Sequence, residues 1–217
     1  MLITRNEIDF QVSDNSLYQS FWNWNEWESA TYDNIKKFSN KEKIFIDIGA
    51  WIGPITLYAA KLNRVCYAFE PDPTAYAELQ SNVITNKLDN VHIYNLAISD
   101  TVGYINMGTV ELGNSMTRIG YDSNSFSVET TTISKFFVDN NINKDDVGLI
   151  KIDVEGAELD ILNDEFFNDI KIPVHLSVHT PFFKNESDIN KILTFVNRYD
   201  NKIETQYPHG FFDVMVY

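Results

Sequence analysis

The sequence has little cysteine and no long apolar run. Its 217 residues include a single cysteine, Cys66, so no disulfide can form within the chain. Cys66 lies inside a short apolar run, where we expect a small core residue. No apolar stretch is long enough to cross a bilayer, and the residues after Met1 lack the pattern of a signal peptide. These absences predict a cytoplasmic protein that is not inserted in a membrane.

Basic residues are also scarce. The chain has 17 lysines and arginines against 31 aspartates and glutamates, which gives a net charge of −14 at pH 7, and it has no basic cluster. Such a surface repels phosphate backbones and anionic lipid headgroups, so nucleic acid is disfavoured as a partner. A local basic groove would still be compatible with this total. The charge predicts a neutral or cationic substrate.

The chain lacks the loops that bind a diphosphate or triphosphate. An apolar run, Ile44–Ile48, leads into Gly49 and Gly53, and Pro54 follows at the first position of an expected helix. A dinucleotide-binding loop needs a glycine two positions after the first, and Trp51 stands there. No Gly-Lys-Ser/Thr sequence follows the loop, which excludes a Walker phosphate site. The strand, loop and helix therefore suit a nucleotide cofactor without phosphate.

A second apolar run, Val65–Phe69, ends on Glu70, about 20 residues beyond the glycine loop. Nucleotide-binding α/β folds place there a carboxylate that accepts hydrogen bonds from ribose hydroxyls. Adenosine without phosphate indicates S-adenosylmethionine, whose methionine part would pass Gly49 and Gly53 and meet amides of the helix near Pro54. A glycine-bearing turn in another α/β domain is the alternative. Asp47 and Glu70 at successive strand ends favour the cofactor site.

Strands and helices alternate along most of the chain, and its 44% hydrophobic content is enough for the core of one domain. The remaining expected strands are Val91–Tyr94, Val147–Ile152 and Val174–Val178, and residues 202–207 and 211–217 form a hairpin around Pro208–Gly210. Helices are expected behind the Asp72-Pro73 cap, over Leu159, Leu162 and Phe166, and over Ile189, Ile192, Val196 and Tyr199. The pattern predicts a mostly parallel sheet that an antiparallel strand closes.

Residues 108–125 break this alternation. They are rich in glycine, asparagine and serine, and they separate two extended segments, residues 98–107 and 126–131. A loop of this length is either a surface connection or a lid that binds a substrate. In the second case Ser115 is a candidate substrate contact.

Residues 1–40 are expected to form a helical segment that packs on, or covers the active site of, a domain made by residues 41–217. Within it one helical stripe contains Leu17, Phe21, Trp24, Ile35 and Phe38, and Glu28 and Thr31 complete the stripe. A break near Trp22–Trp27 would let Glu28 reach water. Alternatively, Glu28 lies over the cofactor or the substrate, with Trp27 beside it, although tryptophans are more often packing residues than platforms for sugars.

Four segments together resemble the FkbM family of S-adenosylmethionine-dependent O-methyltransferases. They are residues 46–53, Ala68–Pro71, Ala97–Asp100 with Gly103, and above all Ile150–Glu158. The resemblance covers about residues 28–178. It implies the class I methyltransferase fold, a Rossmann-like, mostly parallel seven-stranded sheet with helices on both faces and a C-terminal antiparallel hairpin. It also implies methyl transfer to a hydroxyl group, often on a sugar or a glycosylated or macrolide product.

The same resemblance assigns a set of residues to the cofactor site. They are Asp47, Gly49, Ala50, Gly53, Glu70, Pro71, Ala97 and Asp153. The chain departs from the family pattern after its fifth expected strand, where members often carry a glutamate and this chain has Ser177, Val178 and His179.

Asp153, Glu155 and His179 are the candidate reaction centre, because they follow neighbouring strands at the edge where open α/β sheets bind ligands. Methyl transfer to an alcohol needs a group that takes the hydroxyl proton, and histidine suits this role near neutral pH. The same three residues are plausible ligands of a divalent ion, Mg²⁺ or Mn²⁺, that would act as a Lewis acid. The metal-free version is favoured, because Mg²⁺ usually avoids histidine.

Some of these acidic and imidazole groups have simpler interpretations. His179 could be a hydrogen-bonded histidine at a strand end, His175 is more consistent with a structural role, and Glu158 suits the first turn of a helix. The predicted activity is methylation of a sugar or glycan hydroxyl. The alternatives are methylation of a lipid, peptide or small-molecule hydroxyl, or a non-catalytic module that binds S-adenosylmethionine.

Overall fold

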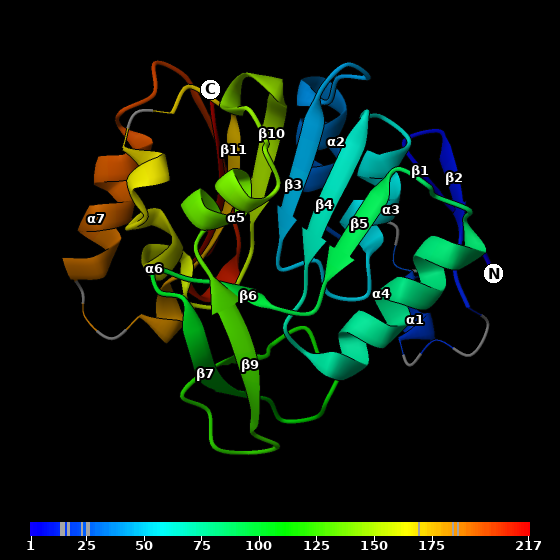
Figure 1. Ribbon diagram of the computed structural model, residues 1–217, viewed down its shortest axis with the longest axis horizontal. Coiled ribbons are helices and arrows are strands. Elements are labelled where there is room, and N and C mark those ends of the chain that lie inside the picture. Colours follow the sequence, from blue (N-terminus) through cyan, green and yellow to red (C-terminus); the bar gives the residue numbers. More distant parts are fainter. Residues whose placement is uncertain are drawn as a thin grey trace.

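The computed structural model describes residues 1–13, 16, 18–22, 24, 27–168, 170–183, 185 and 187–217. Within these residues the largest sheet has seven strands in the order β12-β13-β11-β10-β3-β4-β5 (Figure 1). Its strands are β3 (Ile44–Ile48), β4 (Val65–Phe69), β5 (Val91–Tyr94), β10 (Val147–Ile152), β11 (Val174–His179), β12 (Lys202–Gln206) and β13 (Phe211–Val216). The first five are parallel, and β13 pairs antiparallel with both β11 and β12. The sheet is therefore mixed, with the expected hairpin at its edge.

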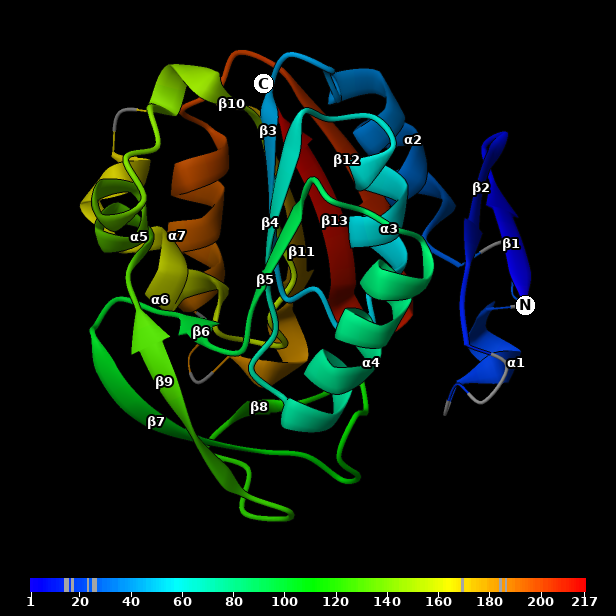
Figure 2. The same cartoon turned by 45° about the vertical axis from the view of Figure 1, so that its right-hand side comes forward.

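Helices cover both faces of this sheet (Figure 2). One face carries α2 (Ser29–Phe38), α3 (Pro54–Ala60) and α4 (Pro73–Thr85), and the other carries α5 (Ile133–Asp139), α6 (Glu158–Leu162) and α7 (Ser187–Val196). Successive residues of a strand point to opposite faces, so Ile46 packs toward α5–α7 and Phe45 toward α2–α4. Because both faces are covered, the central strands read as continuous apolar runs. Cys66 is fully buried, as expected.

Short helical turns complete the chain, and two expected helices are shorter than predicted. The turns are η1 (Lys144–Asp146), η2 (Glu165–Phe167), η3 (Thr180–Phe182) and η4 (Pro208–Gly210). Phe166 lies in η2 rather than in α6, and α7 ends before Tyr199. No helix among the described residues is long and apolar enough to cross a membrane.

The N-terminal segment differs from the helical segment predicted for residues 1–40. β1 (Leu2–Arg5) and β2 (Ile8–Gln11) form an antiparallel hairpin, because Ile3 and Phe10 alternate with polar residues and bury their side chains. The described helices of the segment are α1 (Gln19–Trp22) and α2. The expected break between Trp22 and Trp27 is therefore present, whereas Leu17, which was placed on the helical stripe, lies outside the described residues.

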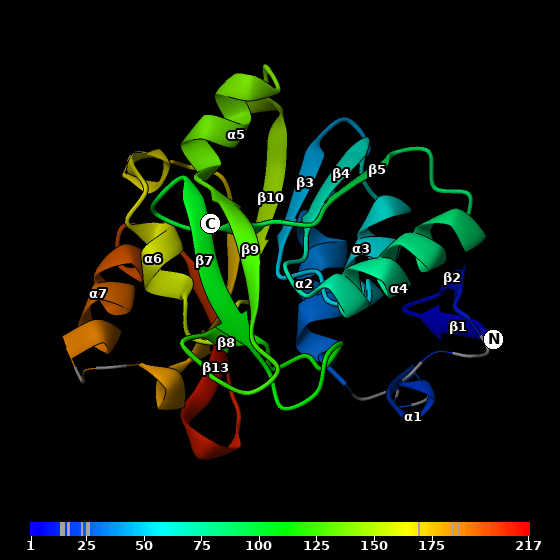
Figure 3. The same ribbon diagram turned by 60° about the horizontal axis from the view of Figure 1, so that its bottom comes forward.

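A four-stranded sheet lies beyond the carboxyl ends of the parallel strands (Figures 1 and 3). Its order is β6-β9-β7-β8, with β6 (Ala97–Ile98), β7 (Gly103–Gly108), β8 (Arg118–Ile119) and β9 (Phe126–Thr131). The loop predicted over residues 108–125 thus contains a short strand. Asp72 fixes this loop: one carboxylate oxygen caps α4, and the other accepts hydrogen bonds from the Gly113 amide at 2.9 Å and the Thr117 hydroxyl at 3.0 Å.

Candidate functional site

A cavity of about 640 Å³ opens at the carboxyl ends of β3, β4, β10 and β11, next to the four-stranded sheet. Eleven of the residues singled out from the sequence line it: Trp27, Glu28, Gly49, Ala50, Glu70, Pro71, Ala97, Ser115, Asp153, Glu155 and His179. Asp47 and Gly53 are not among the lining residues. Ser115 belongs to the segment 108–125, so that segment forms part of the cavity wall.

The loop after β3 lies directly against the end of β10. At Gly49 φ is 83°, and a Cβ there would lie 1.7 Å from the carbonyl oxygen of Asp153, so no side chain fits. Trp51 is also in the left-handed region, with φ of 49°. Its amide donates to Glu70 Oε2 at 2.7 Å, and its indole Nε1 donates to the carbonyl oxygen of Gly113 at 2.7 Å. Trp51 therefore ties the glycine loop to Glu70 and to the segment 108–125.

Glu70 follows the last residue of β4, and each of its carboxylate oxygens accepts a hydrogen bond from a backbone amide. Oε1 accepts from the Asp72 amide at 2.8 Å, and Oε2 accepts from the Trp51 amide. Burial raises the pKa of Glu70 to about 8, although both amides oppose the shift. Each carboxylate oxygen has two lone pairs, so Glu70 keeps acceptor capacity for hydroxyl groups in the cavity.

Asp47 acts behind the cavity wall. It is fully buried, accepts from the Thr56 hydroxyl at 2.6 Å, and pairs with Lys151 Nζ at 3.2 Å. Lys151 Nζ also lies 3.4 Å from Asp153 Oδ2 and donates to the Gly49 carbonyl at 2.9 Å. Gly53 is the N-cap of α3, and a Cβ there would lie 2.6 Å from Leu79 Cδ1.

Lys151 does line the cavity, and the sequence analysis did not single it out. The sequence feature that could have identified Lys151 is its position inside an apolar strand, because burying an ammonium without a partner is costly.

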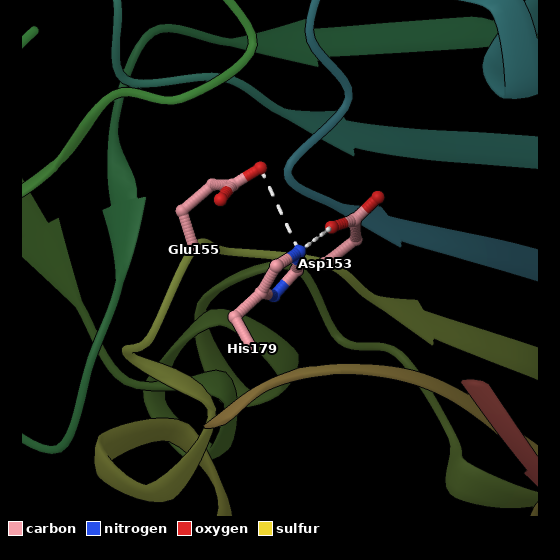
Figure 4. A group of neighbouring side chains, drawn as sticks. All are labelled: Asp153, Glu155 and His179. Carbon is pink, nitrogen blue, oxygen red and sulfur yellow. Dashed lines mark ion pairs between the residues drawn. The ribbon is translucent and has the colours of Figure 1, made fainter. Parts of the chain in front are cut away.

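Asp153, Glu155 and His179 come together as the order of the strands predicted. Figure 4 shows both carboxylates beside the imidazole. His179 Nε2 lies 3.6 Å from Asp153 Oδ1 and 3.6 Å from Glu155 Oε1. One ligand atom of each residue lies within 4.8 Å of the others, so the three are also close enough to hold a metal ion. Glu155 is held in the left-handed region, with φ of 55°.

Glu158 is a member of this centre that the sequence did not reveal. It stands in the first turn of α6, as predicted, but its side chain is fully buried against His179. His179 Nδ1 lies 2.6 Å from Glu158 Oε1, which also accepts from the Gly156 amide at 3.1 Å. A carboxylate at this distance holds the proton on Nδ1, so Nε2 is the nitrogen that faces Asp153 and Glu155.

Burial and neighbouring charges shift the pKa values of His179, Glu155 and Asp153. Burial alone would lower the pKa of His179, but the hydrogen bond to Glu158 and the charges of Asp153 and Glu155 raise it to about 9. Burial raises the pKa of Glu155 to about 7, although His179 opposes it. Burial would also raise the pKa of Asp153, but Lys151 and His179 lower it. At neutral pH these shifts favour an imidazolium at His179 and an ionised Asp153, and they leave Glu155 between its two forms.

The N-terminal segment supplies another wall of the cavity. Trp22 is a core residue, 1% exposed, whereas Trp24 and Trp27 line the cavity. Glu28 precedes α2 with φ of 46°, and its Oε2 is buried without a hydrogen-bond partner. The helix is broken as one interpretation required, but this oxygen does not reach water. Glu28 lines the cavity.

The sheet order, the glycine loop and the cavity at the strand ends define an α/β protein of the class I methyltransferase type. The family model for the methyltransferase FkbM domain matches residues 47–203. The chain therefore belongs to the FkbM methyltransferase family.

Solved structures with this fold have low sequence identity to the chain. The FkbM methyltransferase from Methylobacillus flagellatus KT is 17% identical, with a TM-score of 0.56, and the match covers 82% of this chain and 44% of that one. An rRNA methylase from Streptococcus thermophilus is 12% identical, with a TM-score of 0.54 and coverage of 87% and 93%. TYW2 from M. jannaschii, solved with AdoMet, is 18% identical, with a TM-score of 0.53 and coverage of 99% and 83%. These likenesses show the fold.

One curated relative has a short matching segment. The tRNA(Phe) (4-demethylwyosine(37)-C(7)) aminocarboxypropyltransferase of Methanocaldococcus jannaschii is 36% identical over 70 residues. The match covers 30% of this chain and 28% of that protein. The chain thus matches little more than a quarter of the relative's length.

Proposed function

We propose that the chain is an S-adenosylmethionine-dependent O-methyltransferase that acts on a hydroxyl group of a sugar or glycan. The observation that carries the proposal is a single cavity with Glu70 at one end and Asp153, Glu155 and His179 at the other. The first group suits a ribose, and the second suits an acceptor that must lose a proton. The FkbM family and the AdoMet-bound relative with the same fold support this assignment.

S-adenosylmethionine fits the residues present. Gly49 leaves no room for a side chain beside Asp153 and so keeps the loop backbone close to the cavity, while Trp51 occupies the position where a pyrophosphate loop needs glycine. Pro71 and Ala97 add lining next to Glu70. Asp47 holds Lys151 against the loop and so contributes through Lys151 rather than by contact. When bound, the cofactor supplies an electrophilic methyl group on a sulfonium.

Glu155 is the proposed proton acceptor. The sequence favoured His179, but an imidazolium has no free lone pair at neutral pH. Glu155, with a pKa of about 7, accepts a proton readily near neutrality. Glu155 would take the proton of the acceptor hydroxyl as that oxygen receives the methyl group. His179 and Asp153 orient the acceptor, and Glu158 holds His179 in position.

A sugar is favoured over RNA by the charges around the cavity, although the names of several relatives refer to RNA. The acidic residues that line it are Glu28, Glu70, Asp153, Glu155 and Asp213. Among the lining residues that the structure describes, Lys151 and His179 are the basic ones, and both are paired with carboxylates. A phosphate backbone would meet repulsion there.

The test supplies methyl-labelled cofactor to a library of glycans and, separately, to tRNA and rRNA. We expect label in a saccharide hydroxyl and little effect of salt, since no phosphate counterions are released. Robust labelling of RNA that falls steeply with salt would contradict the proposed acceptor. Absence of S-adenosylhomocysteine binding in calorimetry would contradict the cofactor.

Repeating the assay with a chelator distinguishes a reaction centre without a metal ion from one in which Asp153, Glu155 and His179 bind a metal ion. In the favoured metal-free version, EDTA leaves the rate unchanged. If EDTA abolished turnover and Mg²⁺ or Mn²⁺ restored it, Asp153, Glu155 and His179 would instead hold the ion, which would act as a Lewis acid.

A further inference from the structure

Two carboxylates line the cavity away from both groups described above. Glu28 precedes α2, and Asp213 lies in β13, where it pairs in register with Ser177 of β11. Three strands, β11, β10 and β3, separate β13 from β4, which carries Glu70 at its end. Asp213 therefore belongs to the acceptor half of the cavity rather than to the half that Glu70 defines, and the pKa of Glu28 is affected by the charges of Asp153 and Asp213.

Glu28 lacks a partner for one of its oxygens. Its Oε2 is buried and has no hydrogen bond, although the residue lines the cavity. Burial raises the pKa of Glu28 well above its usual range, the charges of Asp153 and Asp213 raise it further, and Lys151 only partly opposes them. A buried oxygen of this kind normally has a partner, so Glu28 Oε2 is suited to pair with a group of a ligand in the cavity.

Two hydroxyl groups hold the carboxylate of Asp213 in position. Its Oδ2 accepts from the Tyr207 hydroxyl at 2.8 Å and from the Thr31 hydroxyl at 3.4 Å. Tyr207 also lines the cavity. His175 Nε2 lies 3.8 Å from Oδ2, but burial lowers the pKa of His175, so this imidazole supplies no positive charge at neutral pH. Both neighbouring hydroxyls orient the carboxylate, and neither is a cation.

The ammonium of Lys151, which also lines the cavity, is paired with other groups. Lys151 Nζ lies 3.2 Å from Asp47 and 3.4 Å from Asp153, and it donates to the Gly49 carbonyl. Its single positive charge is thus shared between two other carboxylates. A carboxyl group that is buried without a dedicated cation resists ionisation, which is why the pKa of Glu28 is raised, and a bound ammonium favours its ionised form.

We propose that Glu28 and Asp213 bind a protonated amine of the acceptor, which makes the acceptor an amino sugar or another amine-bearing polyol. This inference rests on the proposed function and narrows its substrate class. The ammonium donates to Glu28 Oε2 and to Asp213, while a hydroxyl of the same molecule faces Glu155. The amino group of the cofactor is the other possible source of an ammonium, and the test separates the two.

The test measures binding of chitosan tetraose and kanamycin to the protein saturated with S-adenosylhomocysteine, each beside its fully N-acetylated form. We expect at least one free amine to bind about 10- to 100-fold more tightly than its acetylated form, the usual effect of a charged hydrogen bond. Glu28→Gln and Asp213→Asn should each abolish most of this preference. Glu42→Gln, at an exposed residue before β3, removes the same charge as Glu28→Gln and should leave the preference intact.

Three results would overturn the inference. The first is that no free amine binds better than its acetylated form to the wild-type protein, a comparison that needs no folded variant. The second is that the preference survives in both Glu28→Gln and Asp213→Asn. The third is that Glu28→Gln weakens S-adenosylhomocysteine binding by about tenfold or more, since the carboxylates would then hold the amine of the cofactor. Loss of S-adenosylhomocysteine binding in the wild type would instead count against the proposed function.

Discussion

His179 Nδ1 lies 2.6 Å from the fully buried Oε1 of Glu158, and this contact orients the imidazole in the reaction centre. The carboxylate holds the proton on Nδ1 and directs Nε2 to Asp153 and Glu155. The same contact raises the pKa of His179 against the effect of burial. Glu158 therefore contributes, with Asp153 and Glu155, to keeping His179 protonated at neutral pH.

The first prediction concerns the pKa of His179. NMR titration of the histidine side chains should find His179 protonated up to about pH 9 in the protein without ligands. Glu158→Gln removes the hydrogen-bonded anion, so the pKa of His179 should fall toward its usual range. Glu42→Gln serves as the matched control and should leave the titration unchanged. An unchanged pKa in Glu158→Gln would show that Glu158 does not control the imidazole.

The second prediction concerns the pH dependence of methyl transfer. Glu155 accepts a proton only when ionised, so kcat/KM should rise as the pH passes about 7. The imidazolium form of His179 is lost as the pH passes about 9, so the rate should fall again there. We expect Glu155→Gln to lower turnover by roughly 10²–10⁴-fold with little change in cofactor affinity. Glu155→Gln with normal turnover on a verified acceptor would rule out Glu155 as the base.

The third prediction concerns Glu70 and the cofactor. Calorimetry should show that Glu70→Ala weakens S-adenosylhomocysteine binding by about 1–3 kcal/mol, because the hydrogen bonds between the Glu70 carboxyl group and the cofactor are lost. Glu70 also accepts from the Trp51 and Asp72 amides, so part of the loss can come from the loop. Glu70→Gln keeps an acceptor for one amide and should lose less affinity. Tight NAD binding without any response to S-adenosylhomocysteine would contradict the cofactor assignment.

The fourth prediction separates close approach from backbone strain in the glycine loop. Gly49 and Gly120 both have positive φ, 83° and 72°, but a Cβ would meet a backbone oxygen at 1.7 Å only at Gly49, since nothing lies within 4 Å at Gly120. Gly120→Ala should cost about 1–2 kcal/mol of unfolding free energy, from the left-handed conformation alone. Gly49→Ala should cost at least about 2 kcal/mol more, because β10 must move away. Equal losses in urea unfolding would contradict the close packing of this loop.

The sequence by itself determined the local features that carry the fold. The apolar run before Gly49 and the proline after Gly53 specify strand, loop and helix through their own backbone preferences. Asp72 specifies the start of α4 in the same way, because a cap binds amides of its own chain segment. The run Ile150–Glu158 carried the family resemblance, because its motif consists of consecutive residues. Local backbone conformation and helix caps depend on residues that are close in the sequence, so the sequence predicts them.

The tertiary structure decided which of these residues meet. The sequence placed Asp47 in the cofactor site, but its pairing with Lys151 across β3 and β10 puts it behind the wall. It assigned Glu158 a place in a helix turn, but the adjacency of β10 and β11 places that carboxylate on His179.

The meeting of Glu28 and Asp213 in one cavity, 185 positions apart in the numbering of the chain, follows from the packing of α2 on the sheet and the antiparallel pairing of β13 with β11. The order of strands and the register between them set these contacts. They are fixed by burial of the whole core, which no single segment encodes.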